Sequence, residues 1–128
     1  DVERSRGLGD VYKRQALQIC IENLEYISMV AGTHNEMSSK FLAELMEKQG
    51  ISKSDNRVYF SQLLGMSDHI SFNLANAGYN VVKYVPYGPV KDVMPYLLRR
   101  AEENTSVGGQ TGRELSLIQK ELSRRKGR

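Results

Sequence analysis

The sequence predicts an α/β fold built on parallel strands, and three observations support this prediction. Short apolar segments rich in β-branched and aromatic residues lie at 27–31, 58–64 and 81–85. A segment with helical spacing of apolar residues follows each of them, and a glycine falls where the first two of these helices should end. Regular alternation of strands and helices is typical of parallel sheets with right-handed crossovers.

The helices before residue 80 follow from the spacing of apolar residues. A short helix over 16–26 begins the predicted fold, and the first strand after it is apolar enough to be covered on both faces. The next helix ends at Gly50, and its apolar residues recur three and four positions apart: Phe41, Leu42, Leu45 and Met46. Ser67 and Asp68 suit the start of the third helix, which Gly78 ends.

Two more helices are predicted after the third strand. Pro89 suits the first turn of a helix that runs to about residue 103, because proline fixes the backbone angle that a helix needs there. Thr111 and Glu114 form a capping box for a final helix that ends near Arg124. Three strands are too few to close a barrel, so the pattern taken alone describes an incomplete α/β sheet.

The first fifteen residues differ from the rest of the chain. They are rich in Gly and Arg and show no periodicity. The run from Asp10 to Gln15 is what one reading frame of a transposon-end sequence used in DNA library preparation would encode. We therefore expect residues 1–15 to be a disordered, non-native cloning or sequencing scar, and residues 16–128 to be the C-terminal part of a longer protein. A natural disordered arm is the alternative.

Composition and charge exclude several functional classes. The 128 residues are 40% hydrophobic and 26% charged, which suits a globular domain, and no apolar run approaches the roughly 20 residues of a spanning helix. The single cysteine, Cys20, excludes an internal disulfide framework and lies in an apolar pattern. The net charge of +3 comes mainly from residues 113–128, which carry six bases and two acids. The body between the termini is slightly acidic, which argues against nucleic-acid binding.

A group of charged and aromatic residues near 100 is the strongest candidate for a binding site. Tyr96, Arg99, Arg100 and Glu103 fall at positions i, i+3, i+4 and i+7 of the predicted helix, so they share one face. Two neighbouring guanidinium groups can bind a carboxylate in a bidentate manner. The alternative is that these arginines complement the helix dipole and pair with Glu102 or Glu103 at the surface.

Each predicted strand ends in polar, aromatic or tightly turned residues, where ligands bind in parallel α/β folds. Thr33, His34 and Asn35 follow the first strand, although Thr33 and Glu36 also match a capping box and His34 then is an exposed loop residue. Two histidines and one distant cysteine lack the spacing of a metal site. The sequence suggests no catalytic triad and no glycine-rich phosphate loop, so we assign no catalytic residue.

From about Ala16 onward the chain resembles the proline dehydrogenases, FAD-dependent enzymes that oxidise L-proline to Δ1-pyrroline-5-carboxylate. The resemblance is carried, in order along the chain, by the segments Gly32-Thr33-His34-Asn35, Gln62-Leu63-Leu64-Gly65-Met66, Lys83-Tyr84-Val85-Pro86-Tyr87-Gly88-Pro89 and Tyr96 to Asn104. It implies a distorted (β/α)8 TIM barrel, of which this chain would supply strands six to eight with their helices and a C-terminal helix.

The resemblance also implies a substrate site. Arg99 and Arg100 would pair with the proline carboxylate. Tyr84 and Tyr96 would form walls around the pyrrolidine ring, and Leu63 would pack nearby. A buried carboxylate needs charge-assisted donors, and a ring that gives up a hydride needs apolar, water-poor walls.

The implied cofactor is FAD. Thr33, His34 and Asn35 would contact it, and Glu103 would help to organise the arginine end of the site. The segments of the family that complete the flavin and substrate pockets do not occur in this chain. We therefore expect the chain alone to be inactive and to retain no FAD.

The resemblance implies L-proline as the substrate and a membrane quinone as the electron acceptor, with peripheral membrane association. The expected location is the cytoplasm, the inner membrane surface of a bacterium, or the mitochondrion of a eukaryote. Two alternatives stay open at this point. One is another flavin-dependent barrel, similar to methylenetetrahydrofolate reductase. The other is a non-enzymatic α/β binding module whose basic tail binds an acidic partner or a membrane.

Overall fold

The protein is described here by a computed structural model. It covers the backbone of residues 2–106 and 110–126 and the side chains of residues 9–102 and 115–126. The chain divides into two compact units, Asp1–Tyr84 and Val85–Arg128, and each is described by itself.

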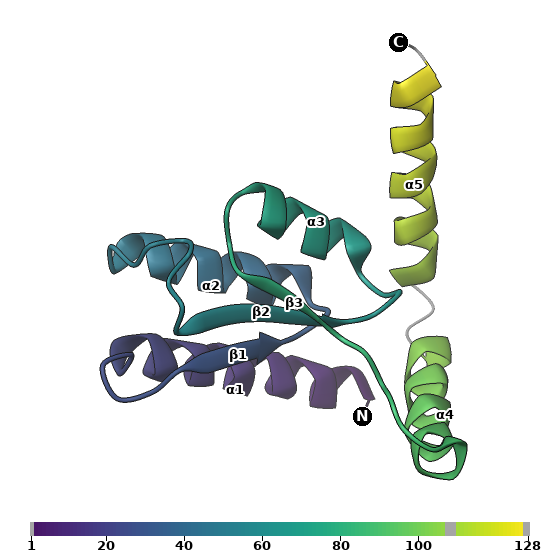
Figure 1. The fold of residues 1–128 in the computed structure, drawn as a ribbon, viewed down its shortest axis with the longest axis horizontal. Coiled ribbons are helices and arrows are strands. Elements are labelled where there is room, and N and C mark those ends of the chain that lie inside the picture. Colours follow the sequence, from purple (N-terminus) through teal and green to yellow (C-terminus); the bar gives the residue numbers. More distant parts are fainter. Residues whose placement is uncertain (1, 107–109, 127–128) are drawn as a thin grey trace. The chain divides into compact units, whose positions relative to one another are not determined.

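The first unit contains a three-stranded parallel sheet (Figure 1). Its elements are α1 (Val2–Glu22), β1 (Met29–Gly32), α2 (Glu36–Lys48), β2 (Val58–Leu63), α3 (Asp68–Asn76) and β3 (Val81–Tyr84). The strands lie side by side in the order β1–β2–β3, and both neighbouring pairs are parallel. The predicted parallel α/β fold and its alternation of strands and helices are confirmed.

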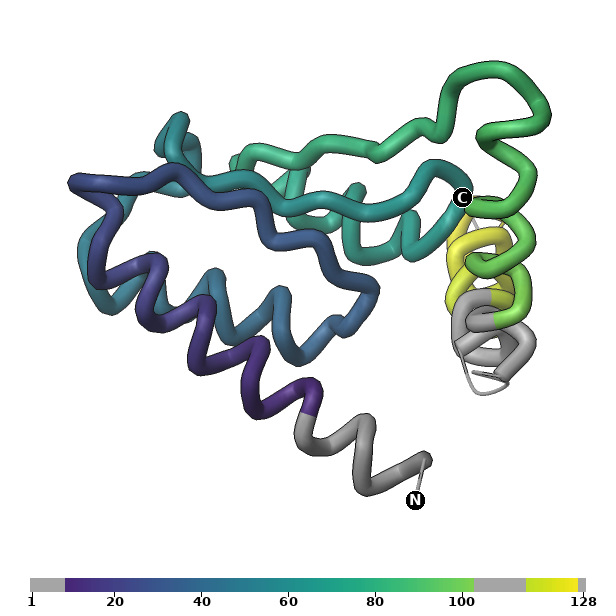
Figure 2. Tube along the Cα trace, turned by 90° about the horizontal axis from the view of Figure 1, so that it is seen from below, coloured from purple at the N-terminus to yellow at the C-terminus, as the bar shows by residue number. Residues whose placement is uncertain are grey.

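Helices α1, α2 and α3 all lie on one side of this sheet (Figure 2). The burial of the strands alternates accordingly. Met29 and Ala31 of β1 are buried, whereas Val30 between them is 63% exposed. The prediction that this strand would be covered on both faces is wrong, because successive side chains of a strand point to opposite faces and the helices cover only one of them. We call the other side the open face.

The hydrophobic core lies between the sheet and the helices. Phe60 in the central strand and Leu42 in α2 are completely buried, and Phe60 also contacts Tyr79 edge to face, with ring centroids 5.4 Å apart. Apolar residues at helical spacing complete the core from α1: Leu17, Ile21 and Leu24. The central position of β2 explains why Val58 and Phe60 are more deeply buried than the core residues of β1.

Helix α1 begins earlier than the sequence predicts. The prediction starts the helix at Ala16 and leaves residues 1–15 disordered, whereas α1 runs from Val2 to Glu22. No proline interrupts this segment, and extending an existing helix costs less than starting a new one. The origin of residues 1–15 as a scar stays a prediction.

The second unit consists of α4 (Val90–Ser106) and α5 (Gln110–Lys126), which confirms the two helices predicted there. Pro95 lies inside α4 and removes one backbone donor from it. The capping box predicted at Thr111 and Glu114 lies outside the described side chains.

Helix α2 is capped by a different residue from the one predicted. Asn35 occupies the N-cap position, and its Oδ1 accepts a hydrogen bond of 3.0 Å from the Ser38 backbone N–H. Thr33 instead accepts the Asn35 backbone N–H through Oγ1, at 3.1 Å. The capping box expected from Thr33 and Glu36 does not form, because the N-cap of α2 is Asn35, two residues after Thr33.

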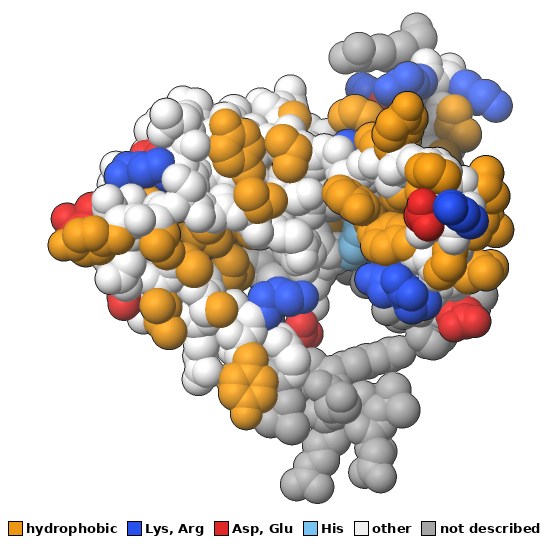
Figure 3. Space-filling view, turned by 60° about the horizontal axis from the view of Figure 1, so that its bottom comes forward, with side chains coloured by type: hydrophobic (Ala, Val, Ile, Leu, Met, Phe, Trp, Pro, Cys, Tyr) orange, Lys and Arg blue, Asp and Glu red, His pale blue; other side chains and the backbone are white. Residues whose placement is uncertain are grey.

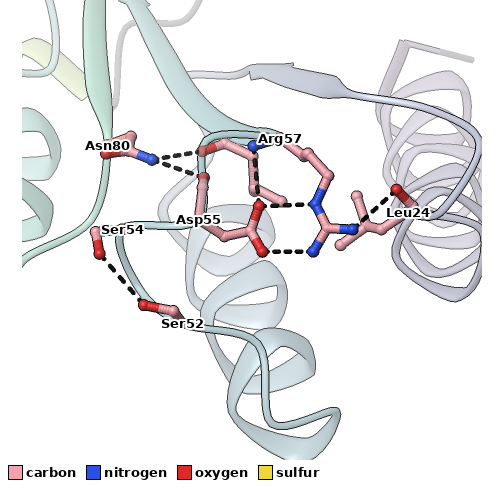
Figure 4. Close-up of polar contacts among 7 residues, drawn as sticks. Leu24, Ser52, Ser54, Asp55, Arg57 and Asn80 are labelled. Atoms are coloured by element: carbon pink, nitrogen blue, oxygen red, sulfur yellow. Dashed lines mark hydrogen bonds and ion pairs between the residues drawn. The ribbon is translucent and has the colours of Figure 1, made fainter.

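A charged cluster joins the amino ends of the strands (Figure 4). The Arg57 guanidinium donates two hydrogen bonds to the Asp55 carboxylate, at 2.9 and 2.6 Å, and a third to the Leu24 carbonyl at 3.2 Å. The Asn80 amide donates to the backbone carbonyls of Asp55 and Val58. We call Asp55, Arg57 and Asn80 the amino-edge cluster, since together they tie the start of β2 to its neighbours on both sides.

We expect Asn35→Ala to lower the free energy of unfolding of the chain by about 1 kcal/mol, because the substitution removes the cap of α2. Urea denaturation followed by circular dichroism measures this change. Asn35→Ser keeps an oxygen that can accept the same N–H and adds no charge beside Asp10, so it should retain most of the stability. Equal stability of the alanine variant and the wild-type chain would contradict the capping role.

The amino-edge cluster predicts a pH dependence of stability. Hydrogen bonds from the Arg57 side chain and backbone lower the pKa of Asp55 from 3.8 to about 2. A carboxyl group whose pKa is lower in the folded state stabilises the fold above its unfolded pKa and loses this effect as the pH falls. The stability advantage of the wild-type chain over Asp55→Asn should therefore be constant above about pH 4 and shrink toward pH 2.

Thermal unfolding of both chains across this pH range measures the effect. Arg57→Met is the matched variant, because without its guanidinium the pKa of Asp55 returns toward the ordinary value. A pH-independent difference between Asp55→Asn and the wild-type chain would show that the ion pair does not stabilise the fold.

Candidate functional site

The carboxyl ends of the three strands lie at one edge of the sheet, which we call the carboxyl edge. Gly32 of β1 is in register with Ser61 of β2, and Leu63 of β2 with Tyr84 of β3. The pairing continues past β1, where the Thr33 backbone N–H donates to the Ser61 carbonyl at 3.1 Å. The parallel pairing therefore brings the β1–α2 and β2–α3 loops together at this edge.

A network of hydrogen-bonded polar side chains joins these two loops. The Gln62 amide donates to the Thr33 carbonyl at 3.3 Å, and the His34 Nδ1 atom lies 2.9 Å from the Ser67 hydroxyl oxygen. The Ser71 hydroxyl lies 2.9 Å from Gln62 Oε1 and 3.3 Å from the Ser67 carbonyl oxygen. We call Thr33, His34, Gln62, Ser67 and Ser71 the carboxyl-edge network.

Sequence reasoning missed the role of three members of this network. Gln62 of β2 faces the helices and is only 2% exposed, so its side-chain amide needs buried hydrogen-bond partners. Ser67 and Ser71 are also buried, although the sequence analysis assigned Ser67 only to helix capping. One signal in the sequence could have revealed Gln62. It is a polar residue at a position where the alternation of the strand requires a buried, apolar one.

Leu63 and Tyr84 lie next to each other on the open face. They are register partners on adjacent strands, and both alternate with residues that face the helices. Leu63 is half-buried and Tyr84 is 52% exposed. Because paired residues on one face are neighbours, the two side chains can line the same surface, and their role beside a substrate stays a prediction.

Asn35 and Thr33 also have partners in α1. The Asn35 amide nitrogen donates to the Asp10 carboxylate at 3.1 Å, and the Lys13 ammonium group lies 3.4 Å from Thr33 Oγ1. Both partners belong to the segment that we interpret as a scar. All three residues predicted to contact a cofactor therefore have side-chain partners within the chain. Asn35 and Thr33 contact α1, and His34 contacts Ser67.

A lysine holds the β2–α3 loop from the third strand. The Lys83 ammonium group donates to the Met66 carbonyl and to the Asp68 carboxylate, both at 2.8 Å. Lys83 alternates with Tyr84 along β3, so it lies on the side of the helices. This contact fixes the loop that carries Ser67.

The second unit carries the predicted arginine pair on α4. The Arg100 guanidinium carbon lies 5.3 Å from the centre of the Tyr96 ring, which is the distance of a cation–π contact. Tyr96 and Arg100 therefore share a face of the helix, as their spacing predicts. Arg100 is half-buried and Arg99 is exposed. The Glu103 side chain lies outside the described residues.

The described residues contain neither a group of metal ligands nor a membrane-spanning helix. Within the described side chains, no three His, Cys, Asp or Glu residues come together as metal ligands. Within the described helices, none combines the length and the apolar character needed to cross a bilayer. Apolar side chains do reach the surface of both units (Figure 3), including Val30 on the open face and Tyr87, which is 97% exposed.

Comparison with known proteins gives consistent results. The sequence model of the family described as proline dehydrogenase matches residues 9–113. Proline dehydrogenase 1, mitochondrial, from Bos taurus is 48% identical over 118 residues, which are 90% of this chain and 20% of the bovine protein. Hydroxyproline dehydrogenase from Xenopus laevis is 43% identical over 109 residues, 85% of this chain and 23% of that protein.

A solved structure resembles this chain as well. It is the crystal structure of proline utilization A (PutA) from Bdellovibrio bacteriovorus inactivated by N-propargylglycine, with a TM-score of 0.65 and 29% identity, covering 72% of this chain and 9% of that one. The chain spans about a fifth of the length of the curated relatives it matches. The family match extends over most of the chain, and the chain therefore belongs to the proline dehydrogenase family.

Proposed function

We propose that this chain is part of an enzyme that oxidises L-proline to Δ1-pyrroline-5-carboxylate with FAD as cofactor. Membership of the family supports this activity. The observation that carries the proposal is the grouping of Tyr96, Arg99 and Arg100 on one helix, with Arg100 against the Tyr96 ring.

The proposed architecture is the last part of a (β/α)8 barrel, with β1, β2 and β3 as strands six to eight and α5 as the C-terminal helix. In such a barrel all helices lie outside and one face of every strand points inward. The position of α1, α2 and α3 on one side of a parallel sheet supports this arrangement. The exposed apolar side chain of Val30 on the open face fits a surface that further strands would cover.

The arginine pair is proposed to bind the substrate carboxylate. Each guanidinium offers several donors in a fixed plane, so two neighbouring ones can satisfy both oxygens of a carboxylate that leaves water. The Tyr96 ring lies against Arg100 and limits the conformations of that long side chain. Less conformational freedom is then lost when proline binds. Glu103 is proposed to organise this end of the site.

The pyrrolidine ring is proposed to lie against Tyr84, Tyr96 and Leu63. Aromatic and apolar walls exclude water from the ring carbon that loses a hydride. FAD supplies the hydride acceptor when it is bound. The residues of this chain orient the ring and the carboxylate, and none of the described side chains is assigned to proton transfer.

The chemistry of the β1–α2 loop fits a contact with FAD. Thr33, His34 and Asn35 stand at the carboxyl edge beside the N-terminus of α2, where backbone N–H groups and the helix dipole favour phosphate oxygens. The hydroxyl, imidazole and amide groups are hydrogen-bonding groups that suit a ribityl or phosphate group. The bond between Asn35 and Asp10 has to open before the Asn35 amide can reach a cofactor.

The electron acceptor is proposed to be a membrane quinone, with the protein associated peripherally with the membrane. The end of α5 supports this association, because it combines basic residues with exposed apolar ones: Leu115, Ile118, Leu122, Arg124, Arg125 and Lys126. The proposed locations are the cytoplasm or inner membrane surface of a bacterium and the mitochondrion of a eukaryote. Several eukaryotic relatives are named mitochondrial.

The two alternative functions lose their support. Membership of the proline dehydrogenase family favours neither a methylenetetrahydrofolate-reductase-like barrel nor a binding module without enzymatic activity. The relative named hydroxyproline dehydrogenase makes trans-4-hydroxy-L-proline a second substrate to assay.

The experiment that tests the proposal uses a full-length proline dehydrogenase that carries this sequence in its matched region, for example in the framework of the bovine relative. The purified protein should retain FAD and reduce an artificial electron acceptor when proline is added. A folded, FAD-loaded protein that reduces no acceptor with proline or hydroxyproline would contradict the proposed function.

In that enzyme, Arg99→Met should raise KM for proline at least about tenfold while FAD stays bound, since the variant loses a charge-assisted contact to the substrate carboxylate. Steady-state kinetics and the visible spectrum of the flavin measure the two effects. Arg124→Met is the matched control, because Arg124 pairs with Glu121 on α5 and should not affect KM. An unchanged KM in Arg99→Met would remove Arg99 from the carboxylate site.

A further inference from the structure

Ser67 adopts a backbone conformation that is unusual for its residue type. Its φ and ψ angles are 52° and 41°, in the left-handed region, and among the described residues it is the one non-glycine residue with positive φ. A side chain with a Cβ atom is strained there, and such strain persists only where surrounding contacts impose it. Glycine would form the same turn without strain. The presence of serine at position 67 therefore suggests that its side chain has a role of its own.

The hydroxyl group of Ser67 does not serve the helix that it precedes. Ser67 occupies the N-cap position of α3, where a serine usually accepts a backbone N–H of the first turn, yet no such bond forms. The Ser67 oxygen instead lies 2.9 Å from Nδ1 of His34, a residue 33 positions earlier in the chain. Ser67 is 6% exposed and His34 is half-buried, so this bond is partly shielded from water.

Buried neighbours hold Ser67 in this position. The Ser67 carbonyl accepts a hydrogen bond from the Ser71 hydroxyl, and Ser71 also binds Gln62, whose amide donates to the Thr33 carbonyl. The contacts thus run from the loop that carries His34, through the central strand, to Ser67 and back to His34. The closed chain of contacts explains how the strained backbone is maintained.

We propose that Ser67 is a positioning residue that fixes the ring orientation of His34 at the FAD site. The proposal rests on the proposed function, in which His34 contacts the cofactor. A hydrogen bond between the Ser67 hydroxyl and Nδ1 restrains rotation of the imidazole, whichever of the two groups donates. The group that His34 presents to the cofactor is then set before FAD binds, which lowers the entropic cost of binding.

Ser67→Gly separates this role from a purely structural one. Glycine adopts the left-handed conformation without strain, so the variant should fold with a thermal stability equal to or above that of the wild type. It removes the hydroxyl group at the same time. A structural role therefore predicts a neutral or favourable substitution, and a positioning role predicts weaker FAD binding in a fully folded protein.

The experiment uses the full-length enzyme described above, freed of FAD and titrated with FAD. Ser67→Gly should raise the dissociation constant for FAD about tenfold and shift the visible absorption bands of the bound flavin, while the unfolding temperature of the apoprotein is not lowered. Ser52→Ala is the control. Its hydroxyl lies 3.2 Å from that of Ser54 in the loop before β2, away from the carboxyl edge, so its removal should leave FAD binding unchanged.

A second measurement makes the result independent of catalysis. The nitrogen shifts of the His34 ring, measured by long-range 1H–15N NMR, report hydrogen bonding at Nδ1, and Ser67→Gly should change them in the apoprotein. FAD affinity within twofold of the wild type, together with unchanged His34 nitrogen shifts, would overturn the proposal. If the wild-type enzyme binds no FAD, the proposed function fails, and the nitrogen shifts still decide whether Ser67 fixes His34.

Discussion

Parallel pairing of three short strands is the constraint on which the first unit depends. Because β1, β2 and β3 run in the same direction, their carboxyl ends meet at one edge and the loops that follow them become neighbours. The register also decides which side chains face the helices and which lie on the open face. A shift of β2 by one residue would move Gln62 to the open face and Leu63 into the core, which would break the contacts to Thr33 and Ser71.

The two edges of the sheet are held by different groups of residues. The amino edge is held by the ion pair of Asp55 and Arg57, together with the Asn80 amide. The carboxyl edge is held by the carboxyl-edge network and by the ion pair of Lys83 and Asp68, and it contains the strained residue Ser67. Ion pairs therefore occur at both edges, whereas Ser67 is, among the described residues, the one non-glycine residue with positive φ.

Much of the fold could be predicted from the sequence, because strands and helices follow from local apolar spacing. The limits of β2, α3 and β3 agree with the prediction to within about two residues. The face that the helices cover could not be predicted, since it depends on the direction of each crossover. The placement of Tyr96 beside Arg100 needed only helical spacing. The bond from His34 to Ser67 joins residues 33 positions apart, and no local pattern reveals such a contact.

The central claim is that neighbouring guanidinium groups on α4 hold the carboxylate of an imino acid next to the flavin. A crystal structure of the full-length enzyme with FAD and an unreactive proline analogue tests it most directly. The account predicts that Arg99 and Arg100 both donate hydrogen bonds of about 2.8 Å to the two carboxylate oxygens, with Tyr84 and Tyr96 against the ring. A bound analogue whose carboxylate pairs with other residues, while both arginines extend into solvent, would contradict the account.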